Sequence, residues 1–429
     1  MLMILVTILD GFGLLQFDFS PLWIAGLAGW LAGLLLFVDA PRVLKIQVST
    51  LFFVGIGLIV FASSNQADID LDAIISANTG LLSMIAAVGF LRLVVLPASL
   101  EKTALPVGPK AFLQTLIGLN ISSSIINISA PILISDRIHQ VRPLQRFTTQ
   151  TFVRIFCGVS SWSPFFGAMA VVLTYVEDAS LGRIIVAGLP FTLFGFMLVY
   201  VEARFRYADE VEAFVGYPTQ FSALKVPVAL ILVVMFLSWM LAHTGILVII
   251  AFSALLVTCA TLLLRSGTAG SAEKLKQHVI QGLPKMVNEL TLFLAAGVLA
   301  AGIAALISHG VITNPFTEFT PFTAAKLLAT MWFFAAIGIH PVIMISGFSP
   351  MILTLDPDPQ LLATTYLFAW NLGTCSSPLS GTNLVFQGRY GIPAWKTAIW
   401  NWPYAIVMLI VAAIWLQVIG DIQGFLFND

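Results

Sequence analysis

The sequence predicts an all-α polytopic membrane protein built from two inverted-topology repeats, each with a re-entrant helical hairpin and a broken transmembrane helix. Composition is the first reason. Of the 429 residues, 59% are apolar and only 10% are charged, whereas soluble proteins carry about 25% charged residues. The other two reasons are apolar runs long enough to cross a bilayer, two of them interrupted by polar residues, and a biased distribution of basic residues.

The apolar runs predict the spans. A spanning helix needs about 20 mostly apolar residues. We therefore expect spans at residues 21–38, 46–63, 75–96, 150–175, 184–201, 226–242, 246–264, 287–307, 361–386 and 397–418. Two further apolar stretches, 111–134 and 321–355, contain too many Asn, Ser, Gly and Pro residues in the middle to be plain lipid-facing helices.

Basic residues predict the orientation, because Lys and Arg accumulate on the cytoplasmic side of membrane proteins. With the loop around residue 42 inside, the basic residues between 137 and 146 are also inside only if residues 111–134 enter and leave by the same face. A re-entrant hairpin does this, and we expect a second one at 321–355. On this topology, all of the 20 basic residues except Arg154, Arg183 and Lys326 lie on the cytoplasmic side.

The two halves match in order but oppose each other in direction, which is the inverted-repeat pattern of secondary transporters. The expected division is N-terminal scaffold helices (1–74), repeat 1 (75–201, hairpin about 111–134, broken helix about 150–175), connecting loops and scaffold helices (202–286), repeat 2 (287–418, hairpin about 321–355, broken helix about 361–387) and a C-terminal tail (419–429).

The strongest local signal is the segment from Asn371 to Asn383, which reads NLGTCSSPLSGTN inside an apolar run. Pro378 removes a backbone donor, and the glycines permit non-helical torsions. Its first-half counterpart, residues 158–167, reads GVSSWSPFFG. A broken helix leaves free amides that suit an oxyanion, and free carbonyls that suit Na⁺ together with Ser, Thr and Asn oxygens. The alternative is that these small residues only permit close helix packing.

Asn- and Ser-rich hairpin tips at 120–129 and 346–350 would complete a central site with the two breaks. The candidate substrate- or ion-binding residues are Asn120, Ser122, Ser123, Ser124, Asn127, Ser160, Ser161, Ser163, Ser346, Ser376, Ser377, Ser380, Gly381, Thr382 and Asn383. The candidates for a Na⁺ site are Asn120, Ser123, Ser380, Thr382 and Asn383.

Titratable residues are scarce at membrane depth. His340 is a candidate proton carrier, because the unperturbed pKa of histidine is about 6.5; the alternative is a neutral histidine hydrogen-bonded at a helix break. Apart from the marginal Arg154 and Asp10, no charged residue lies clearly at the centre of a span, which favours Na⁺ over H⁺ coupling. Arg154 or Arg389 would add positive charge near the site. The favoured interpretation, however, is that both arginines flank the membrane and extend their charged ends to water.

The paired hairpins, the segment SSPLSGTN at 376–383 and its first-half echo resemble the ion transporter superfamily, which includes divalent-anion/sodium symporters, citrate transporters, arsenite permeases and the large membrane subunits of TRAP transporters. The resemblance implies a static scaffold, a mobile elevator domain, a homodimer, and substrate and Na⁺ sites at Ser-Asn-Thr motifs. Ser380, Thr382 and Asn383 match these residue types in the order Ser-Gly-Thr-Asn. In the first half, serines 122–124 follow Asn120 with no Thr.

Together these features predict Na⁺-coupled uptake of a small carboxylate or inorganic oxyanion across a bacterial inner membrane, by elevator-type alternating access. No cofactor other than Na⁺ and no nucleic-acid partner is expected. A passive channel and the membrane subunit of a TRAP-like system are the alternatives. An intramembrane enzyme would need a titratable or metal-binding cluster, and the sequence offers only His340, with no phosphate loop, HExxH, EF-hand or GxSxG motif.

Overall fold

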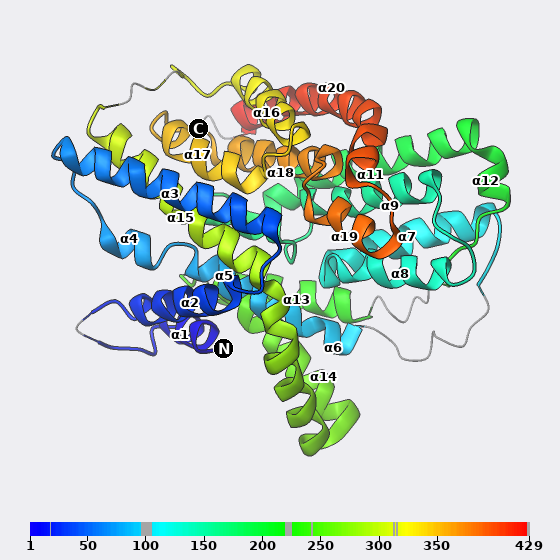
Figure 1. Ribbon diagram of the computed structural model, residues 1–429, viewed down its shortest axis with the longest axis horizontal. Coiled ribbons are helices and arrows are strands. Elements are labelled where there is room, and N and C mark those ends of the chain that lie inside the picture. The colour runs from blue at the N-terminus through cyan, green and yellow to red at the C-terminus, as the bar shows by residue number, and fades with distance from the viewer. Residues whose placement is uncertain are drawn as a thin grey trace.

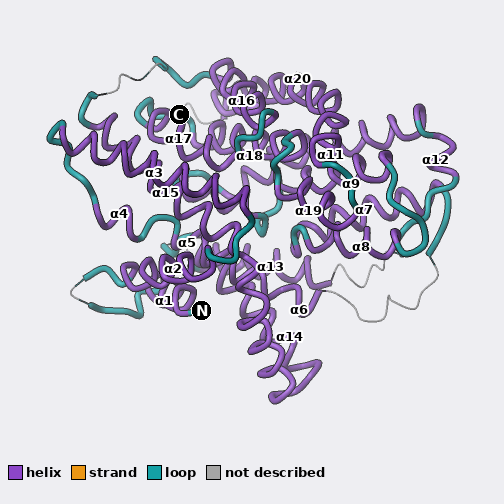
Figure 2. Tube along the Cα trace, in the orientation of Figure 1, coloured by secondary structure: helices purple, strands orange, loops and turns teal. Residues whose placement is uncertain are grey.

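The computed structural model describes residues 1–17, 19–95, 105–218, 225–241, 243–311, 314 and 316–426. This part of the chain is helical almost throughout, and its only β pairing is one antiparallel bridge between Val107 and Val215 (Figures 1 and 2). The predicted all-α class is confirmed. The last residue of each of the predicted spans 75–96 and 226–242 lies outside the described ranges. The last three residues of the predicted tail, 427–429, also lie outside them.

The helices of the first half follow one another in this order: α1 (Leu2–Gly11), α2 (Leu22–Phe37), α3 (Arg42–Ser64), α4 (Leu71–Ile75), α5 (Thr79–Val88), η1 (Gly89–Leu91), α6 (Arg92–Val95), α7 (Pro109–Ile126), α8 (Ser129–His139), α9 (Arg146–Gly158), η3 (Val159–Ser161), α10 (Gly167–Tyr175), α11 (Leu181–Arg206) and α12 (Ala208–Glu212). Those of the second half are α13 (Lys225–Met240), α14 (Ile246–Gln277), η5 (His278–Gly282), η6 (Leu283–Met286), α15 (Val287–Ser308), α16 (Pro321–Ala336), α17 (Pro341–Leu353), α18 (Pro359–Ser376), α19 (Gly381–Tyr390) and α20 (Ala394–Leu426).

Four helical segments among the described residues are long and apolar enough to cross a membrane: Arg42–Ser64, Leu181–Arg206, Ile246–Ser308 and Ala394–Ile422. Several of the other predicted spans are shorter apolar helices or are interrupted. Only 22% of the most apolar window of Arg42–Ser64 is buried inside the protein. Such a large exposed apolar surface requires an apolar surrounding, and a bilayer provides one.

The two polar-interrupted stretches are broken helices. In the first, α7 ends at Ile126, Asn127 has a left-handed φ of 50°, and α8 begins at Ser129 and packs back on α7. In the second, α16 ends at Ala336 and α17 begins at Pro341, with Gly338 at a φ of 110° between them. The arms of this second pair pack mainly on different partners, α16 on α18 and α20 and α17 on α15.

The expected tip at 346–350 is wrong, because these residues lie inside α17. The break lies at 337–340 instead. His340 is the N-cap of α17 and Pro341 occupies the first helical position, where its missing N–H costs no hydrogen bond.

Candidate functional site

The first broken helix packs against the α7–α8 turn. The chain leaves the helical path after Ser161 and resumes it at Gly167. Ser163 Oγ donates to Ser124 O at 2.5 Å, and Asn127 Nδ2 donates to Phe165 O at 3.2 Å. The contacts therefore join the hydroxyl-rich end of α7 to the break between α9 and α10.

The second break, between α18 and α19, has its carbonyl oxygens occupied by side chains. Asn383 Nδ2 donates to Ser377 O at 2.8 Å, Asn401 Nδ2 donates to Cys375 O at 3.4 Å, and Trp402 Nε1 donates to Ser376 O at 3.2 Å. These carbonyls are therefore not the bare groups expected from the sequence. The amide oxygen of Asn383 is buried and has no hydrogen-bond partner within the described part of the chain.

Ser380 begins the helix that follows this break. Its side chain accepts a hydrogen bond from Asn383 N at 3.3 Å, so it is the N-cap of α19. An N-cap of this kind stabilises a helix by about 1 kcal/mol. The predicted residues at positions 377, 380 and 383 thus form one local cluster.

The first break contacts α18 directly, a little more than one turn before the second break. Asn371 Nδ2, on α18, donates to Ser161 Oγ at 2.9 Å, and both residues are buried. Helix α11 covers the junction, because Thr192 Oγ1 donates to Gly158 O at 2.9 Å. Ser161 is thereby joined to a residue 210 positions away in the chain.

Arg154 is the main charged group beside this junction, and the expectation that it snorkels to water is wrong. It is only 3% exposed. Its guanidinium donates to Asn401 Oδ1 at 2.8 Å, to Trp400 O at 3.1 Å and to the Glu202 carboxylate. Its Cζ lies 4.9 Å from the centre of the Tyr404 ring. Three helices, α9, α11 and α20, are joined through one guanidinium.

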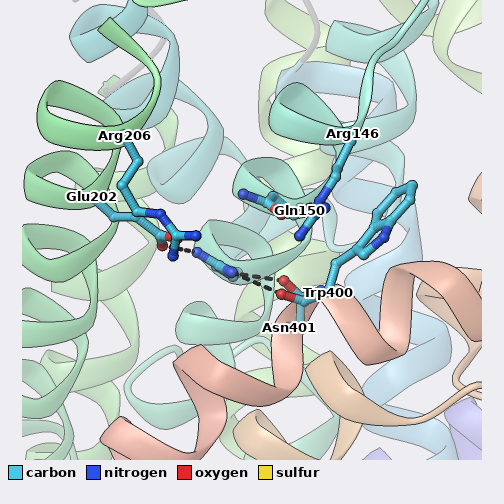
Figure 3. A network of polar contacts seen from close by, with 7 residues as sticks. Arg146, Gln150, Glu202, Arg206, Trp400 and Asn401 are labelled. Atoms are coloured by element: carbon cyan, nitrogen blue, oxygen red, sulfur yellow. Dashed lines mark hydrogen bonds and ion pairs between the residues drawn. The ribbon is translucent and has the colours of Figure 1, made fainter.

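Glu202 was missed by the sequence analysis because it was placed at the cytoplasmic end of a span. Its second carboxylate oxygen lies 3.4 Å from Arg206 NH1, one turn further along α11. Figure 3 shows Glu202 and Arg206 on one side of the network, and Trp400 and Asn401 on the other. Arg154 is thus neutralised by a carboxylate that has a second cationic partner near the surface.

A small cavity of about 10 Å³, which is room for about one water molecule, lies at the junction. Its polar lining comes from Asn120, Arg154, Thr192, Asn371 and Tyr404. The remaining lining is Ile155, Gly158, Phe191 and Phe196. The arrangement offers a cation, amide groups and an apolar wall to one small molecule.

Several buried oxygens near these elements have no hydrogen-bond partner among the described residues. They are Ser123 Oγ, Asn371 Oδ1, Thr374 Oγ1 and Asn383 Oδ1. An unsatisfied buried acceptor costs about 1–3 kcal/mol, so each of these atoms needs a partner, which a water molecule, a ligand or an ion can supply. The hydroxyl and amide oxygens among them are ligand types that Na⁺ accepts.

The other predicted residues lie in less informative positions. Ser160 Oγ donates to Cys157 O at 2.7 Å, Ser376 Oγ accepts from Trp332 Nε1 at 3.1 Å, and Ser346 Oγ donates to Ile343 O within α17. Ser122, Gly381 and Thr382 lie on α7 and α19. His340 Nδ1 accepts from Val342 N at 3.2 Å, which is the hydrogen-bonded histidine given above as the alternative to a proton carrier.

Substituting Gly188 by Ala is expected to disturb the junction. A Cβ there would lie 1.7 Å from Ser161 O, so α11 and the first break must separate. We expect a loss of about 1–3 kcal/mol in the free energy of unfolding, measured by thermal or denaturant unfolding in detergent. Gly182→Ala is the matched control on the same helix, since a Cβ there meets nothing within 4 Å. Equal stability of the two variants would contradict this packing.

The sequence matches no known protein-family profile, and it matches no curated protein. The structure, by contrast, is similar to the crystal structure of the YdaH transporter of Alcanivorax borkumensis, described as having an unusual topology. The TM-score is 0.59 at 13% sequence identity, and the match covers 87% of this chain and 98% of that chain. The chain therefore has the fold of a solved membrane transporter.

Proposed function

We propose that the protein is a secondary active transporter that takes up a small anion, coupled to Na⁺, across a bacterial inner membrane. The observation that carries this proposal is the buried Arg154 beside a small cavity where two broken helices meet. A charged side chain at membrane depth is costly, so it is found where function requires it. The fold shared with a membrane transporter supports the same conclusion.

An anion is the proposed substrate because of the charge at the cavity. Arg154 has five N–H donors, of which three bind Asn401, Glu202 and Trp400. Two remain to bind a carboxylate or oxyanion, which guanidinium groups recognise well. Glu202 also has Arg206 as a second partner, so part of its charge is balanced independently of Arg154.

Sodium is the proposed coupling ion because of the unpartnered oxygens. Ser123 Oγ and Asn383 Oδ1 belong to the expected Na⁺ ligands, and Na⁺ would remove the cost of leaving them unsatisfied. Asn120, Ser380 and Thr382 complete the proposed set.

Alternating access is proposed to follow from two inverted repeats. The α7–α8 and α16–α17 pairs would act as hairpins that enter the membrane from opposite faces, and the α9–α10 and α18–α19 breaks would move with them as an elevator. The cavity beside Arg154 is too small here for an organic anion, so substrate would enter when the hairpins shift. We expect a homodimer assembled through the remaining helices.

A ligand screen by thermal shift tests the proposal. The purified full-length protein is heated with a panel of small carboxylates and inorganic oxyanions, first in NaCl and then in KCl at equal ionic strength. We expect at least one anion to raise the melting temperature more in Na⁺ than in K⁺, because ligands stabilise the state that binds them. No anion-dependent shift in either salt would contradict the proposal.

A further inference from the structure

Two buried cysteines occupy matching positions in the two halves of the chain. Cys157 is the last residue but one of α9, and Cys375 is the last residue but one of α18. Each helix leads into one of the two breaks. The two side chains are 1% and 0% exposed, and both thiols are free. The proposed transport function gives neither thiol a role.

A contact beside the first break sets the register between the two helices. Asn371 Nδ2 donates to Ser161 Oγ at 2.9 Å. Cys375 follows Asn371 by four residues on α18, and Cys157 precedes Ser161 by four residues. Residues four apart lie about one turn from each other on the same face of a helix. Each cysteine is therefore about one turn away from this contact.

Asn401 supplies a second contact, which shows that the two cysteines lie in the same direction from the first one. Its Oδ1 accepts from Arg154 Nε at 2.8 Å, and its Nδ2 donates to Cys375 O at 3.4 Å. Arg154 precedes Cys157 by three residues, so the two share a face of α9. Cys157 is thus bracketed by two contacts that lead to α18, and its thiol interacts directly with that of Cys375.

We propose that Cys157 and Cys375 form a redox-sensitive modification site, at which hydrogen peroxide closes a disulfide that ties the two breaks together. One thiol, as its thiolate, attacks a peroxide oxygen. The O–O bond breaks, a sulfenic acid forms, and the thiol proton leaves in the first water. The second thiol attacks the sulfenic sulfur, so the S–S bond forms, the S–O bond breaks and a second water leaves. The two sulfurs are oxidised, and the peroxide is reduced to water.

Burial determines which oxidant reaches the pair and how fast it reacts. A small uncharged oxidant such as hydrogen peroxide enters an apolar interior at lower cost than a charged one. Buried thiols ionise less readily than exposed ones, so the reaction is slower than at a surface cysteine. The bacterial cytoplasm keeps thiols reduced, and a disulfide at this position therefore forms only when oxidant is in excess, as in redox-sensing proteins.

Peptide mapping by mass spectrometry tests the inference on the full-length protein in detergent. The protein is treated with hydrogen peroxide at mildly alkaline pH, which increases the thiolate fraction, and the remaining thiols are alkylated. We expect a cross-linked peptide that contains Cys157 and Cys375 and disappears after treatment with dithiothreitol. The oxidised protein should also melt at a higher temperature than the reduced protein, because the disulfide restricts the unfolded chain over a long loop.

The third cysteine of the chain provides the matched control. Cys259 lies on α14 and is partly buried. Cys259→Ser keeps only the proposed pair and should give the same cross-link and the same rise in melting temperature. Cys157→Ser leaves Cys375 without its partner and should give neither. If Cys157→Ser fails to fold, the wild type and Cys259→Ser still decide.

Two results overturn the inference. One is the absence of the product that joins Cys157 to Cys375 well after Cys259 has been fully oxidised. The other is a cross-link that joins Cys259 to either member of the pair in its place. No transported substrate enters this test, so its result is independent of the proposed function.

Discussion

Arg154→Gln is expected to destabilise the protein by about 3–5 kcal/mol and to abolish the stabilisation by anions. The variant leaves the Glu202 carboxylate, which is 20% exposed, without its buried partner. Breaking one side of a buried ion pair costs about this much. Arg206 still offsets part of the Glu202 charge, but Asn401 Oδ1 and Trp400 O lose their donor as well. Unfolding and anion-dependent thermal shift, measured on the same preparation, report the two effects separately.

The double variant Arg154→Gln, Glu202→Gln separates the effect on stability from the effect on anion binding. Replacing a buried ion pair by neutral groups is often close to neutral for stability, so the double variant should recover most of the lost stability. It should still fail to respond to anions, because no cation remains at the cavity. Glu202→Gln alone should respond to anions more strongly than the wild type, since Arg154 then lacks its counter-ion.

Arg389→Gln is the matched control for the loss of an ion-paired arginine. Arg389 NH2 lies 2.7 Å from Asp136 Oδ2, but its side chain is 51% exposed. Exposed ion pairs contribute about 1 kcal/mol or less, so this variant should be nearly as stable as the wild type and should bind anions normally. An equal loss of anion response in Arg389→Gln would contradict the role given to Arg154.

Asn383→Ala and Ser380→Ala are expected to lose the Na⁺-dependent increase in melting temperature. The first removes the unpartnered amide oxygen, and the second removes the hydroxyl that begins α19. A bound ion stabilises the folded state in proportion to the logarithm of its concentration over its Kd. Melting curves from low to high NaCl, at an ionic strength held constant with KCl, measure this slope.

A helix cap elsewhere provides the control for these variants. Thr320 begins α16 and accepts from Thr323 N at 3.3 Å, the same distance as in the Ser380 cap. Thr320→Ala should lose about 1 kcal/mol and keep the full Na⁺ slope. If Asn383→Ala and Ser380→Ala also keep the slope, the proposed Na⁺ site is wrong.

The local features of the fold follow from the sequence because they depend on neighbouring residues. Pro378 places a break in the second half, and α18 ends at Ser376; Gly373 and Gly381 are themselves helical. The predicted tip at 346–350 is wrong because Ser, Gly and Pro residues do not by themselves end a helix, and α17 continues through Pro350. The dipeptide of His340 and Pro341, a cap followed by proline at the first helical position, marks the actual helix start.

The charged part of the candidate site could not be predicted in the same way. Glu202 lies 48 residues from Arg154, and Asn401 lies 247 residues from it. No local pattern relates positions so far apart, and an arginine near the end of a span ordinarily snorkels to water. The pairing depends on how α9, α11 and α20 pack, which the sequence alone does not specify. Asn371 was part of the recognised motif, but its contact with Ser161 required the same knowledge of packing.

Uptake into proteoliposomes tests most directly whether the chain moves an anion by Na⁺ coupling. The full-length protein is reconstituted, and the radiolabelled acid with the largest thermal shift is added under an inward Na⁺ gradient or an equal K⁺ gradient. We predict accumulation above the external concentration with Na⁺ only, and none with the Arg154→Gln, Glu202→Gln double variant. Equilibration to the external concentration in both salts, as a passive channel would give, would contradict the account.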